Sequence, residues 1–232
     1  DSTVFILLLN WNGLADTTEC LQSLQAVTYP NFRTVVVDNA SDGGEAKALR
    51  DAFGDYIDLI ESETNLGFAG GANLGMRHAL EQGADYVLLL NNDTTVDPAF
   101  LSEMIAAMER LPAAAAACPK TYFYDRRDEI YSTGGRYSLL KGTARQAGRG
   151  QTDRGQFDKM AVRDYADGVC MLIPRTALER VGLLDEDYFA YWEETDWCAR
   201  ARQAGLRCYY IPSAKVWHKA ARSQERSNEF QY

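Results

Sequence analysis

Short apolar runs alternate with segments of helical periodicity through the first half of the chain. Runs such as VFILLL and YVLLL are typical of buried strands, and the segments between them place apolar residues three or four apart. This alternation predicts βαβ units and a mostly parallel central sheet with helices on both faces, a Rossmann-like three-layer α/β/α sandwich. The expected strands lie at 4–9, 34–38, 56–62 and 86–90, and the expected helices lie at 16–24, 45–53, 72–82 and 98–110.

The second half of the chain has a different texture. Strands are predicted within 113–125 and 166–175, and an amphipathic helix within 191–205 that ends at Gly205. The intervening stretch 125–164 is rich in glycine and holds nine Lys or Arg against six Asp or Glu. It favours a solvated hairpin with loops, and the alternative is a mobile, partly basic flap over an anionic ligand. With no internal repeat and no clear linker, we expect one domain over 1–232, with a donor half at about 1–110 and an acceptor half at about 111–232.

Polar side chains follow three of the predicted parallel strands at the point where each strand ends. Ligands of open α/β sheets bind beyond the carboxyl ends of the strands, so we expect these side chains to share one rim. They are Asn10, Trp11 and Asn12 after the first strand, Asp38 and Asn39 after the second, and Asn91, Asn92 and Asp93 after the fourth.

The second strand ends in VVVDNASDGG. A carboxylate at Asp38 can accept the imide N–H of a uracil or thymine, while Asn39 caps the turn. The alternative is an ordinary Asx turn, in which Asp38 and Asn39 bond only their own backbone. Both interpretations remain open on this stretch alone.

The segment TNLGFAGGANLGMRHAL places four glycines around Asn65 and Asn73, ahead of a predicted helix. Glycine lets the backbone approach a ligand closely, and a helix N-terminus favours an anion. The spacing matches neither the G-x-G-x-x-G of dinucleotide folds nor a P-loop. The alternative is a glycine-rich connection with a packing role. The glycines are Gly67, Gly70, Gly71 and Gly75.

The segment LLLNNDTTVDP carries a carboxylate to the same rim. Hard divalent cations take oxygen ligands and bridge to substrate phosphates, so Asp93 is the main candidate metal ligand, with Asn91 and Asn92 in supporting positions. Turn chemistry is the alternative, because Asn and Asp often end strands.

Glu193, Glu194 and Asp196 lie within one turn of the last predicted helix. Acidic residues in a first turn favour the helix dipole, and Asp196 stands four residues before Arg200, in a favourable order for an ion pair. Two aromatic residues precede the cluster, however, and a carboxylate beside apolar rings can serve as a general base with a raised pKa.

Composition narrows the function. The net charge of -9 argues against general nucleic-acid binding, because such a surface repels phosphates. Five widely spaced cysteines without a CxxC pair indicate neither a disulfide framework nor a zinc site, so a reducing compartment is expected. The first apolar run is not preceded by basic residues, so it is interpreted as a first strand and not as a signal peptide. No run approaches the roughly 20 apolar residues of a membrane span.

Six segments together resemble one known family. NWNG, VVVDNAS, NLGFAGGAN, LLNND, YFAYWEETDWCARARQAG and VWH occur in the order found in inverting family 2 glycosyltransferases with the GT-A fold, and the chain is most similar to their rhamnosyltransferase-like branch. The likeness covers nearly all residues from Val4 to about His218. The resemblance implies a single displacement that moves a sugar, with rhamnose the first candidate, from a UDP- or dTDP-sugar to an acceptor hydroxyl in cell-surface glycan or glycoconjugate synthesis.

The resemblance also implies roles for individual residues. Asp93 would bind a divalent cation, Mg²⁺ or Mn²⁺, on the donor diphosphate, and His218, which by itself is more typical of a surface or packing residue, would complete the metal site. Asp38 would hold the pyrimidine. The other donor-side residues implied are Asn10, Asn12, Asn39, Asn65, Gly67, Asn73 and Asn92.

On the acceptor side the resemblance implies Glu194 as general base, with Glu193 and Asp196 as alternates. Gly168 and Trp192 would approach the donor sugar and the acceptor. Two departures from the family pattern stand out, because Glu194 replaces an Asp and Asn91 replaces the first acidic residue of the metal motif. The second departure leaves fewer charged metal ligands.

The implied partners are a nucleotide-sugar donor and a glycan, lipid-linked or protein acceptor, and no nucleic acid is expected. The expected location of the protein is the cytoplasm, where it could also associate peripherally with the inner face of the membrane. Two other functions remain as alternatives. One is a nucleotide-sugar binding module without turnover. The other is a sugar nucleotidyltransferase, which would want a glycine-rich, Arg- and Lys-containing loop after the first strand, where this chain has NWNGLADTT.

Overall fold

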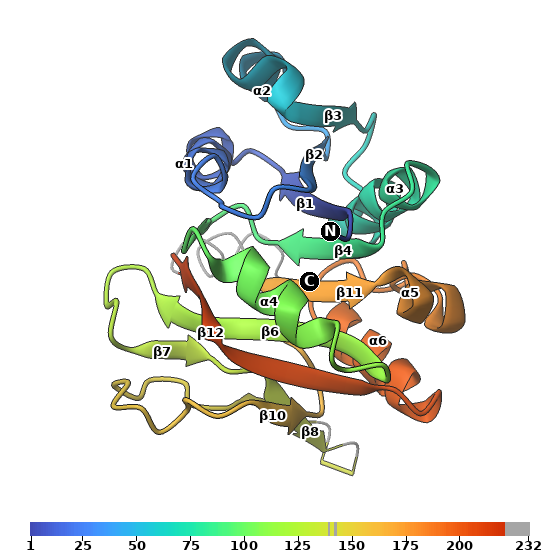
Figure 1. The fold of residues 1–232 in the computed structure, drawn as a ribbon. Helices are drawn as coiled ribbons and strands as arrows, with labels where there is room; N and C mark the ends of the chain where they lie inside the picture. The colour runs from blue at the N-terminus through green and yellow to red at the C-terminus, as the bar shows by residue number, and fades with distance from the viewer. Residues whose placement is uncertain (139, 142, 221–232) are drawn as a thin grey trace.

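The computed structural model describes residues 1–138, 140–141 and 143–220, and its centre is one twisted mixed β-sheet (Figure 1). Two very short strands, β5 (Thr94–Val96) and β7 (Ile130–Ser132), pair with its members off the main path. Along that path the strands are, in spatial order, β3 (Ile57–Glu61), β2 (Phe32–Asp38), β1 (Val4–Asn10), β4 (Tyr86–Leu90), β11 (Cys170–Pro174), β6 (Ala114–Phe123), β12 (Arg207–His218) and β10 (Ala161–Arg163).

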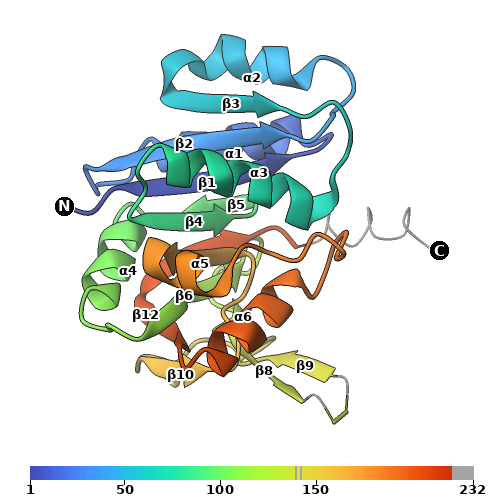
Figure 2. The same ribbon diagram turned by 90° about the vertical axis from the view of Figure 1, so that its right-hand side faces the viewer.

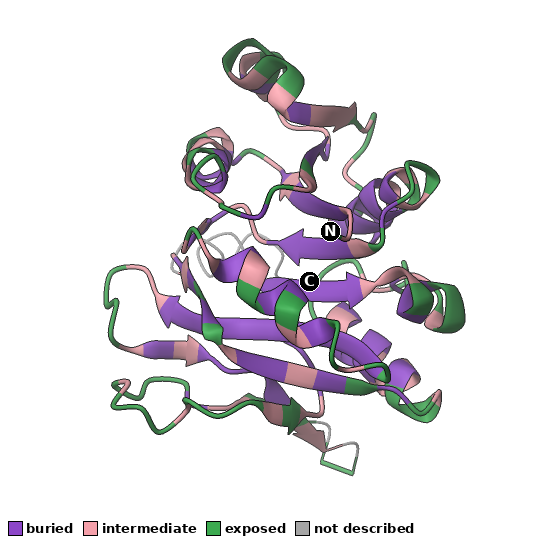
Figure 3. Ribbon diagram, in the orientation of Figure 1, coloured by how far each residue is buried: buried purple, intermediate pink, exposed green. Residues whose placement is uncertain are grey.

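The first half of the chain forms the parallel part of the sheet, as the sequence predicts. β1 pairs in parallel with β2 on one side and β4 on the other, and β2 pairs in parallel with β3. The apolar runs are buried on both faces, which is why they read as continuous rather than alternating (Figure 3). The register sets Asn10 opposite Asp38, so two of the predicted rim residues are neighbours at the strand ends.

The second half adds strands of both directions. β11 lies antiparallel between β4 and β6, whereas β12 runs parallel to β6. The sequence pattern does not predict β12, because Pro212 and a shift of register between Ile211 and Lys215 interrupt its period. That missed strand carries His218 across the sheet to the rim.

Helices cover both faces of the sheet, so the expected three-layer architecture is confirmed (Figures 1 and 2). One core lies between the sheet and α3, α5 and α6, and the other lies beneath α1 and α4, with Leu49 of α2. The helices are α1 (Leu14–Leu24), α2 (Glu45–Phe53), the 3-10 turn η1 (Gly54–Tyr56), α3 (Gly67–Glu81), α4 (Phe100–Met108), α5 (Arg175–Val181) and α6 (Glu193–Gln203).

The glycine-rich segment corrects one expectation. It does not precede its helix but forms the first turns of α3, which begins at Gly67. A Cβ at Gly71 would collide with the Leu9 side chain, and one at Gly75 would lie 3.2 Å from Val37. These glycines therefore let the helix pack closely on β1 and β2, which is the packing role that the sequence left open.

The charged stretch 125–164 contains β7, β10 and a separate hairpin of β8 (Gly135–Ser138) and β9 (Thr143–Gln146), which projects from the body of the molecule (Figure 2). The expected hairpin is confirmed. Within the described part of the chain, no helix combines the length and apolar character needed to cross a membrane. All five cysteines are buried and free of disulfides.

Candidate active site

The predicted nucleoside end of the rim is a dense set of hydrogen bonds around Asp38. Its Oδ2 accepts from Asn10 Nδ2 at 2.8 Å and its Oδ1 accepts from the Ser41 backbone N–H at 3.0 Å. The amide of Asn10 also reaches Glu45 Oε2 at 2.9 Å, while Asn12, in the left-handed region at φ 49°, accepts from a backbone N–H of the next loop at 2.8 Å. Asn10 and Asn12 thus fix the loop geometry, and Asp38 is the carboxylate that they present at the rim.

Asn39 and Asn65 organise the neighbouring loop. The side-chain amide of Asn39 donates to Asn65 Oδ1 at 2.9 Å and to the Gly67 carbonyl at 3.1 Å, and its oxygen accepts from the Leu66 N–H. Gly67 has φ +70°, and a Cβ there would collide with Phe189. The Phe68 N–H donates to the Phe189 carbonyl at 2.6 Å, so the segment around Phe189 closes over this loop.

These residues line a cleft of about 190 Å³ at the carboxyl edge of the sheet. Because the sequence predicts that a donor binds at this edge, we call it the donor cleft. Phe189 and Ala190 form one wall of it, although the sequence did not single them out as site residues. They belong to the segment YFAYWEETDWCARARQAG, but their place in the cleft depends on the fold. The lining residues are Leu9, Trp11, Asn39, Asn65, Gly67, Phe68, Leu90, Asn91, Asn92, Asp93, Phe189 and Ala190.

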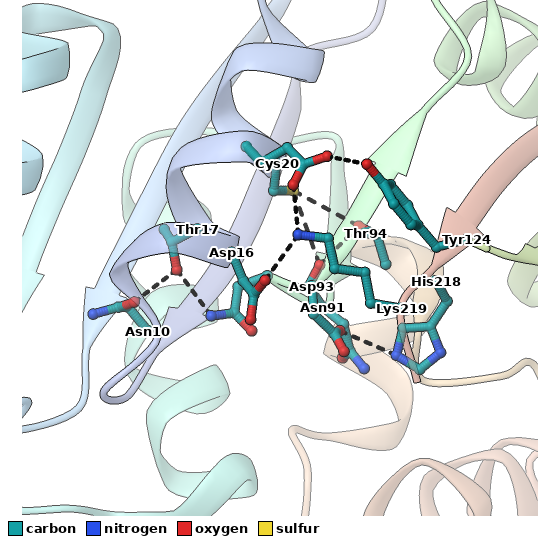
Figure 4. A network of polar contacts seen from close by, with 12 residues as sticks. Asn10, Asp16, Thr17, Cys20, Asn91, Asp93, Thr94, Tyr124, His218 and Lys219 are labelled. Carbon is teal, nitrogen blue, oxygen red and sulfur yellow. Dashed lines mark hydrogen bonds and ion pairs between the residues drawn. The ribbon is translucent and has the colours of Figure 1, made fainter. Parts of the chain in front are cut away.

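Asp93 and His218 lie next to each other at this edge of the sheet. His218 lies opposite Thr94 in the β12–β5 pairing, and the Lys219 N–H donates to the Asp93 carbonyl at 3.0 Å, so backbone pairing fixes the approach. His218 Nε2 lies 3.0 Å from Asp93 Oδ1, and both side chains are buried (Figure 4). The Tyr131 ring packs edge-on against the imidazole, with ring centroids 4.6 Å apart.

This pair fits a divalent cation. The approach of His218 to Asp93 is close but not aligned as a hydrogen bond, so both ring nitrogens lack an aligned hydrogen bond within the described residues. No group of three or more His, Cys, Asp or Glu residues there could hold a metal ion. Two protein ligands would suit an ion that keeps water and substrate phosphates in its other positions. Asn91 and Asn92 line the same cleft as Asp93.

Helix α1 ties the two ends of the donor site together (Figure 4). The Thr17 hydroxyl donates to Asn10 Oδ1 at 2.6 Å and accepts from Asn92 Nδ2 at 2.8 Å. Lys219 Nζ donates to Asp16 Oδ1 at 2.8 Å and to Glu19 Oε2 at 2.5 Å. The sequence did not predict these contacts of α1, because Asp16, Thr17 and Glu19 resemble the polar face of an ordinary helix.

Two of the three carboxylates at the start of α6 lie in surroundings that disfavour their charged form. Burial raises the pKa of Glu193 to about 7. Burial, followed by the charges of Glu193 and Asp167, raises the pKa of Glu194 to about 8. A Cβ on Gly168 would stand 3.4 Å from the Glu194 side chain, so these two predicted site residues lie against each other.

Asp167 was missed from the sequence, although it stands beside Gly168. Its oxygens accept from Gln146 Nε2 at 2.6 Å and from the Val169 N–H at 3.1 Å. It is buried, and its charge acts on Glu194. A carboxylate directly before a glycine at the start of a buried strand is the only local signal that it offers.

Two predicted site residues have other partners. Asp196 Oδ2 accepts from Arg200 Nε at 2.8 Å, as the helical i,i+4 alternative predicts. Asn73 bonds the backbone of Leu184 in both directions, at 2.8 and 3.0 Å, and donates to Glu186. Asn73 therefore joins α3 to the loop before α6 and does not line the donor cleft. Trp192 does not line that cleft either.

Comparisons with known proteins agree with this architecture. Among solved structures, GalNAc-T7 with UDP, GalNAc and Mn²⁺ superposes with a TM-score of 0.78 at 15% identity, over 94% of this chain and 44% of that chain. The mannosyltransferase PcManGT of Pyrobaculum calidifontis, in complex with GDP-Man and Mn²⁺, gives a TM-score of 0.70 at 19% identity, over 98% and 61% of the two chains. The expected GT-A fold is confirmed by these neighbours.

Curated relatives include two rhamnosyltransferases. The dTDP-rhamnosyl transferase RfbF of Shigella flexneri is 24% identical over 94% of this chain and 69% of its own length. The N-acetylglucosaminyl-diphospho-decaprenol L-rhamnosyltransferase of Mycobacterium tuberculosis is 26% identical over 89% and 72%.

A third relative is the low-salt glycan biosynthesis hexosyltransferase Agl10 of Haloferax volcanii, which is 25% identical over 87% of this chain. The chain spans 62% of the length of that relative. The profile of glycosyl transferase family 2 matches residues 5–182, and this chain therefore belongs to glycosyl transferase family 2.

Proposed function

We propose that this domain transfers a sugar from a UDP- or dTDP-sugar to an acceptor hydroxyl with inversion, in the synthesis of a cell-surface glycan or glycoconjugate. One observation carries the proposal. Asp93 and His218, from distant parts of the chain, approach to 3.0 Å, and Asp93 lines the same cleft as Asn39 and Asn65. The two rhamnosyltransferase relatives support dTDP-rhamnose as the first donor to test.

The donor would lie along the rim of the sheet. Asp38 would accept the imide N–H of the pyrimidine, and the Asn65–Gly67 loop would contact the nucleoside. Asp93 and His218 would hold Mg²⁺ or Mn²⁺, which supplies positive charge to the oxygens of the diphosphate. The Mn²⁺ named with both solved structures supports this cofactor.

In this proposal Glu194 acts as the general base. Its carboxylate takes the proton of the acceptor hydroxyl, and that oxygen forms a bond to the anomeric carbon. The bond from the anomeric carbon to the phosphate oxygen breaks, and its electron pair leaves with the nucleoside diphosphate. A single displacement of this kind inverts the configuration. The raised pKa of Glu194 makes its carboxylate a stronger base than an exposed one.

A donor screen tests the proposal. The protein is incubated with Mn²⁺ or Mg²⁺ and a panel of UDP- and dTDP-sugars, and release of nucleoside diphosphate is measured with and without chelator. We expect release from at least one donor, and its loss with chelator. Tight donor binding without release from any donor, with a panel of saccharide acceptors present, would identify a binding module instead. In a parallel incubation with added pyrophosphate, formation of a sugar 1-phosphate together with a nucleoside triphosphate would identify a nucleotidyltransferase.

A further inference from the structure

The hairpin of β8 and β9 belongs to a segment with a concentration of positive charge. Residues 130–152 contain four Lys or Arg and no Asp or Glu, although the chain as a whole has a net charge of -9. Three of the four, Arg136, Lys141 and Arg145, lie in the hairpin, and all three are exposed. A positive segment on an acidic protein is suited to an anionic partner.

Strand pairing brings two of these cations together. Arg136 lies directly opposite Arg145, and like charges at opposed positions of an antiparallel pair destabilise it. In the described part of the chain, neither arginine has an ion pair with an acidic residue, and Lys141 has none either. The described residues therefore leave the charge of the hairpin for a partner to neutralise.

The hairpin has an apolar face and a basic face. Tyr137 and Ala144, which lie opposite each other, pack against the hydrophobic core on the α6 side of the sheet. Because side chains alternate between the two faces of a strand, Arg136 and Arg145 lie on the other face, away from that core. The packing of the apolar face therefore holds the two arginines toward solvent.

The hairpin also reaches beyond the acidic body of the molecule (Figure 2). Each of its strands has four residues, a length of about 13 Å in extended backbone. In physiological salt, exposed charges more than about 8 Å apart are largely screened from each other. An anionic surface at the far end of the hairpin is therefore attracted by the nearby cations and only weakly repelled by the body.

Exposed apolar and aromatic side chains accompany these cations. Leu140, in the turn of the hairpin, is 96% exposed. Trp192 and three residues of the hairpin line one small cleft of about 180 Å³, so the neighbouring Tyr191, which is 58% exposed, lies close to the hairpin as well. Leucine and aromatic residues beside Lys and Arg are typical of surfaces that rest in the interface of a bilayer. A soluble polyanion would account for the cations but not for the exposed leucine.

We propose that the β8–β9 hairpin docks the protein on an anionic lipid bilayer. Its three cations bind headgroup phosphates, while Leu140 and Tyr191 enter the boundary between headgroups and acyl chains. A single signal of either kind gives only weak membrane binding, so the charged and the apolar contacts act together.

The base of the hairpin lies close to the proposed reaction centre. Gln146 Nε2, at the end of β9, donates to Asp167 Oδ2 at 2.6 Å, and Asp167 precedes the Gly168 that lies against Glu194. A bilayer bound to the hairpin therefore lies beside the active site, which favours a lipid-linked acceptor. Only this choice of acceptor rests on the proposed function.

Vesicle flotation tests the inference. The protein is mixed with vesicles of phosphatidylcholine alone, or of phosphatidylcholine with the anionic phosphatidylglycerol, at increasing NaCl. We expect binding to the anionic vesicles only, and weaker binding as salt rises. Each Lys or Arg near an anionic surface contributes about fivefold in affinity, so Arg136→Gln/Arg145→Gln should weaken binding at least about 10-fold. Lys47→Gln/Arg50→Gln on α2, at the opposite end of the molecule (Figure 1), changes the net charge equally and should bind as the wild type does.

Leu140→Ser separates a bilayer from a soluble polyanion. It removes the apolar contact and no charge, so binding to anionic vesicles should weaken by about fivefold or more, while the melting temperature stays that of the wild type because the side chain is exposed. Unchanged vesicle binding in Leu140→Ser or in the hairpin arginine variant, an equal loss in the α2 control, or equal binding to phosphatidylcholine alone would overturn the inference.

The two proposals fail separately, because vesicle binding requires neither donor nor turnover. Nucleotide release from a donor without vesicle binding would leave the transferase standing and remove the bilayer contact. Vesicle binding through the hairpin with no nucleotide release from any donor would keep the bilayer contact and remove the transferase.

Discussion

The donor rim and the start of α6 differ in how far the buried polar side chains are hydrogen-bonded within the protein. At the rim, Asp38, Asn10 and Asn39 are buried and bonded to one another or to nearby backbone. At α6, Glu193 is buried, and its Oε2 has no hydrogen-bond partner among the described residues. A site that only recognises a ligand can satisfy its own polar groups in advance. The proposed base Glu194 and its neighbour Glu193 instead lie in surroundings that raise the pKa of both carboxyls.

Removal of the proposed base is the strongest test of this contrast. Glu194→Gln keeps the shape of the side chain but cannot accept a proton, so we expect kcat to fall by about 10²–10⁴-fold while donor binding is unchanged. Nucleotide release and donor titration measure the two effects. Glu103→Gln on α4 is the matched control. Wild-type turnover in Glu194→Gln would remove the base assignment.

The metal end of the donor rim should show the next largest effect. Asp93→Asn keeps the size of the side chain but removes the charge that faces His218, so the apparent affinity for Mn²⁺ should fall by at least about 10-fold, the lower end of the loss seen for outer-shell partners. Titration of activity and of the paramagnetic ion itself measures it. Asp97→Asn, at the turn after β5, serves as control. An unaltered Mn²⁺ affinity in Asp93→Asn would place the ion elsewhere.

Ionisation of the buried Glu193 carboxyl should destabilise the folded protein at alkaline pH. Because burial raises its pKa from 4.5 to about 7, the folded state holds a proton that the unfolded state has released, and the free energy of unfolding falls as pH rises between these values. Glu193→Gln removes that penalty, so it should be more stable than the wild type at pH 8 by up to about 3 kcal/mol, with little difference at pH 4. Denaturation at the two pH values measures this. An equal gain at both would mean that charge is not the cause.

The donor rim, by contrast, should lose stability when one member is removed. Thr17→Val deletes the hydroxyl that joins Asn10 to Asn92 and leaves the buried Asn10 amide oxygen without that donor, at a cost of about 1–3 kcal/mol. Thr17→Ser should restore most of the loss. Denaturant unfolding and the KM for the donor report the two consequences. A harmless Thr17→Val would show that the network is not needed.

The smallest expected effect is a shift in the pH profile. Glu194 must be ionised to act, so kcat/KM should fall as pH drops below about 8. Glu193→Gln removes a neighbouring negative charge and should move this limb to lower pH by a fraction of a unit to one unit. A limb near the ordinary carboxyl pKa of 4.5 in the wild type would contradict the burial of the base.

The parallel strands, their order of appearance and the rim at their ends follow from the sequence alone. Strands such as VFILLL and YVLLL are buried on both faces, and their hydrophobicity is a local property that needs no partner to be recognised. Asp38 and Asp93 likewise follow directly from the ends of such strands. The acidic start of α6 is equally visible, although its sequence leaves dipole compensation and catalysis equally open.

Only the tertiary structure decided which polar residues meet. β12 has an irregular pattern, so its path beside β6, and with it the arrival of His218 at Asp93, depends on pairing across the sheet. Gly71 and Gly75 of α3 are explained by their close contacts with Leu9 of β1 and Val37 of β2, which are distant in the sequence. The burial of Glu193 and the position of Phe189 and Ala190 in the donor cleft likewise depend on contacts between distant segments. The hydrophobic periodicity of a segment indicates which of its side chains are buried. Which segments lie next to each other depends on the packing of the whole chain.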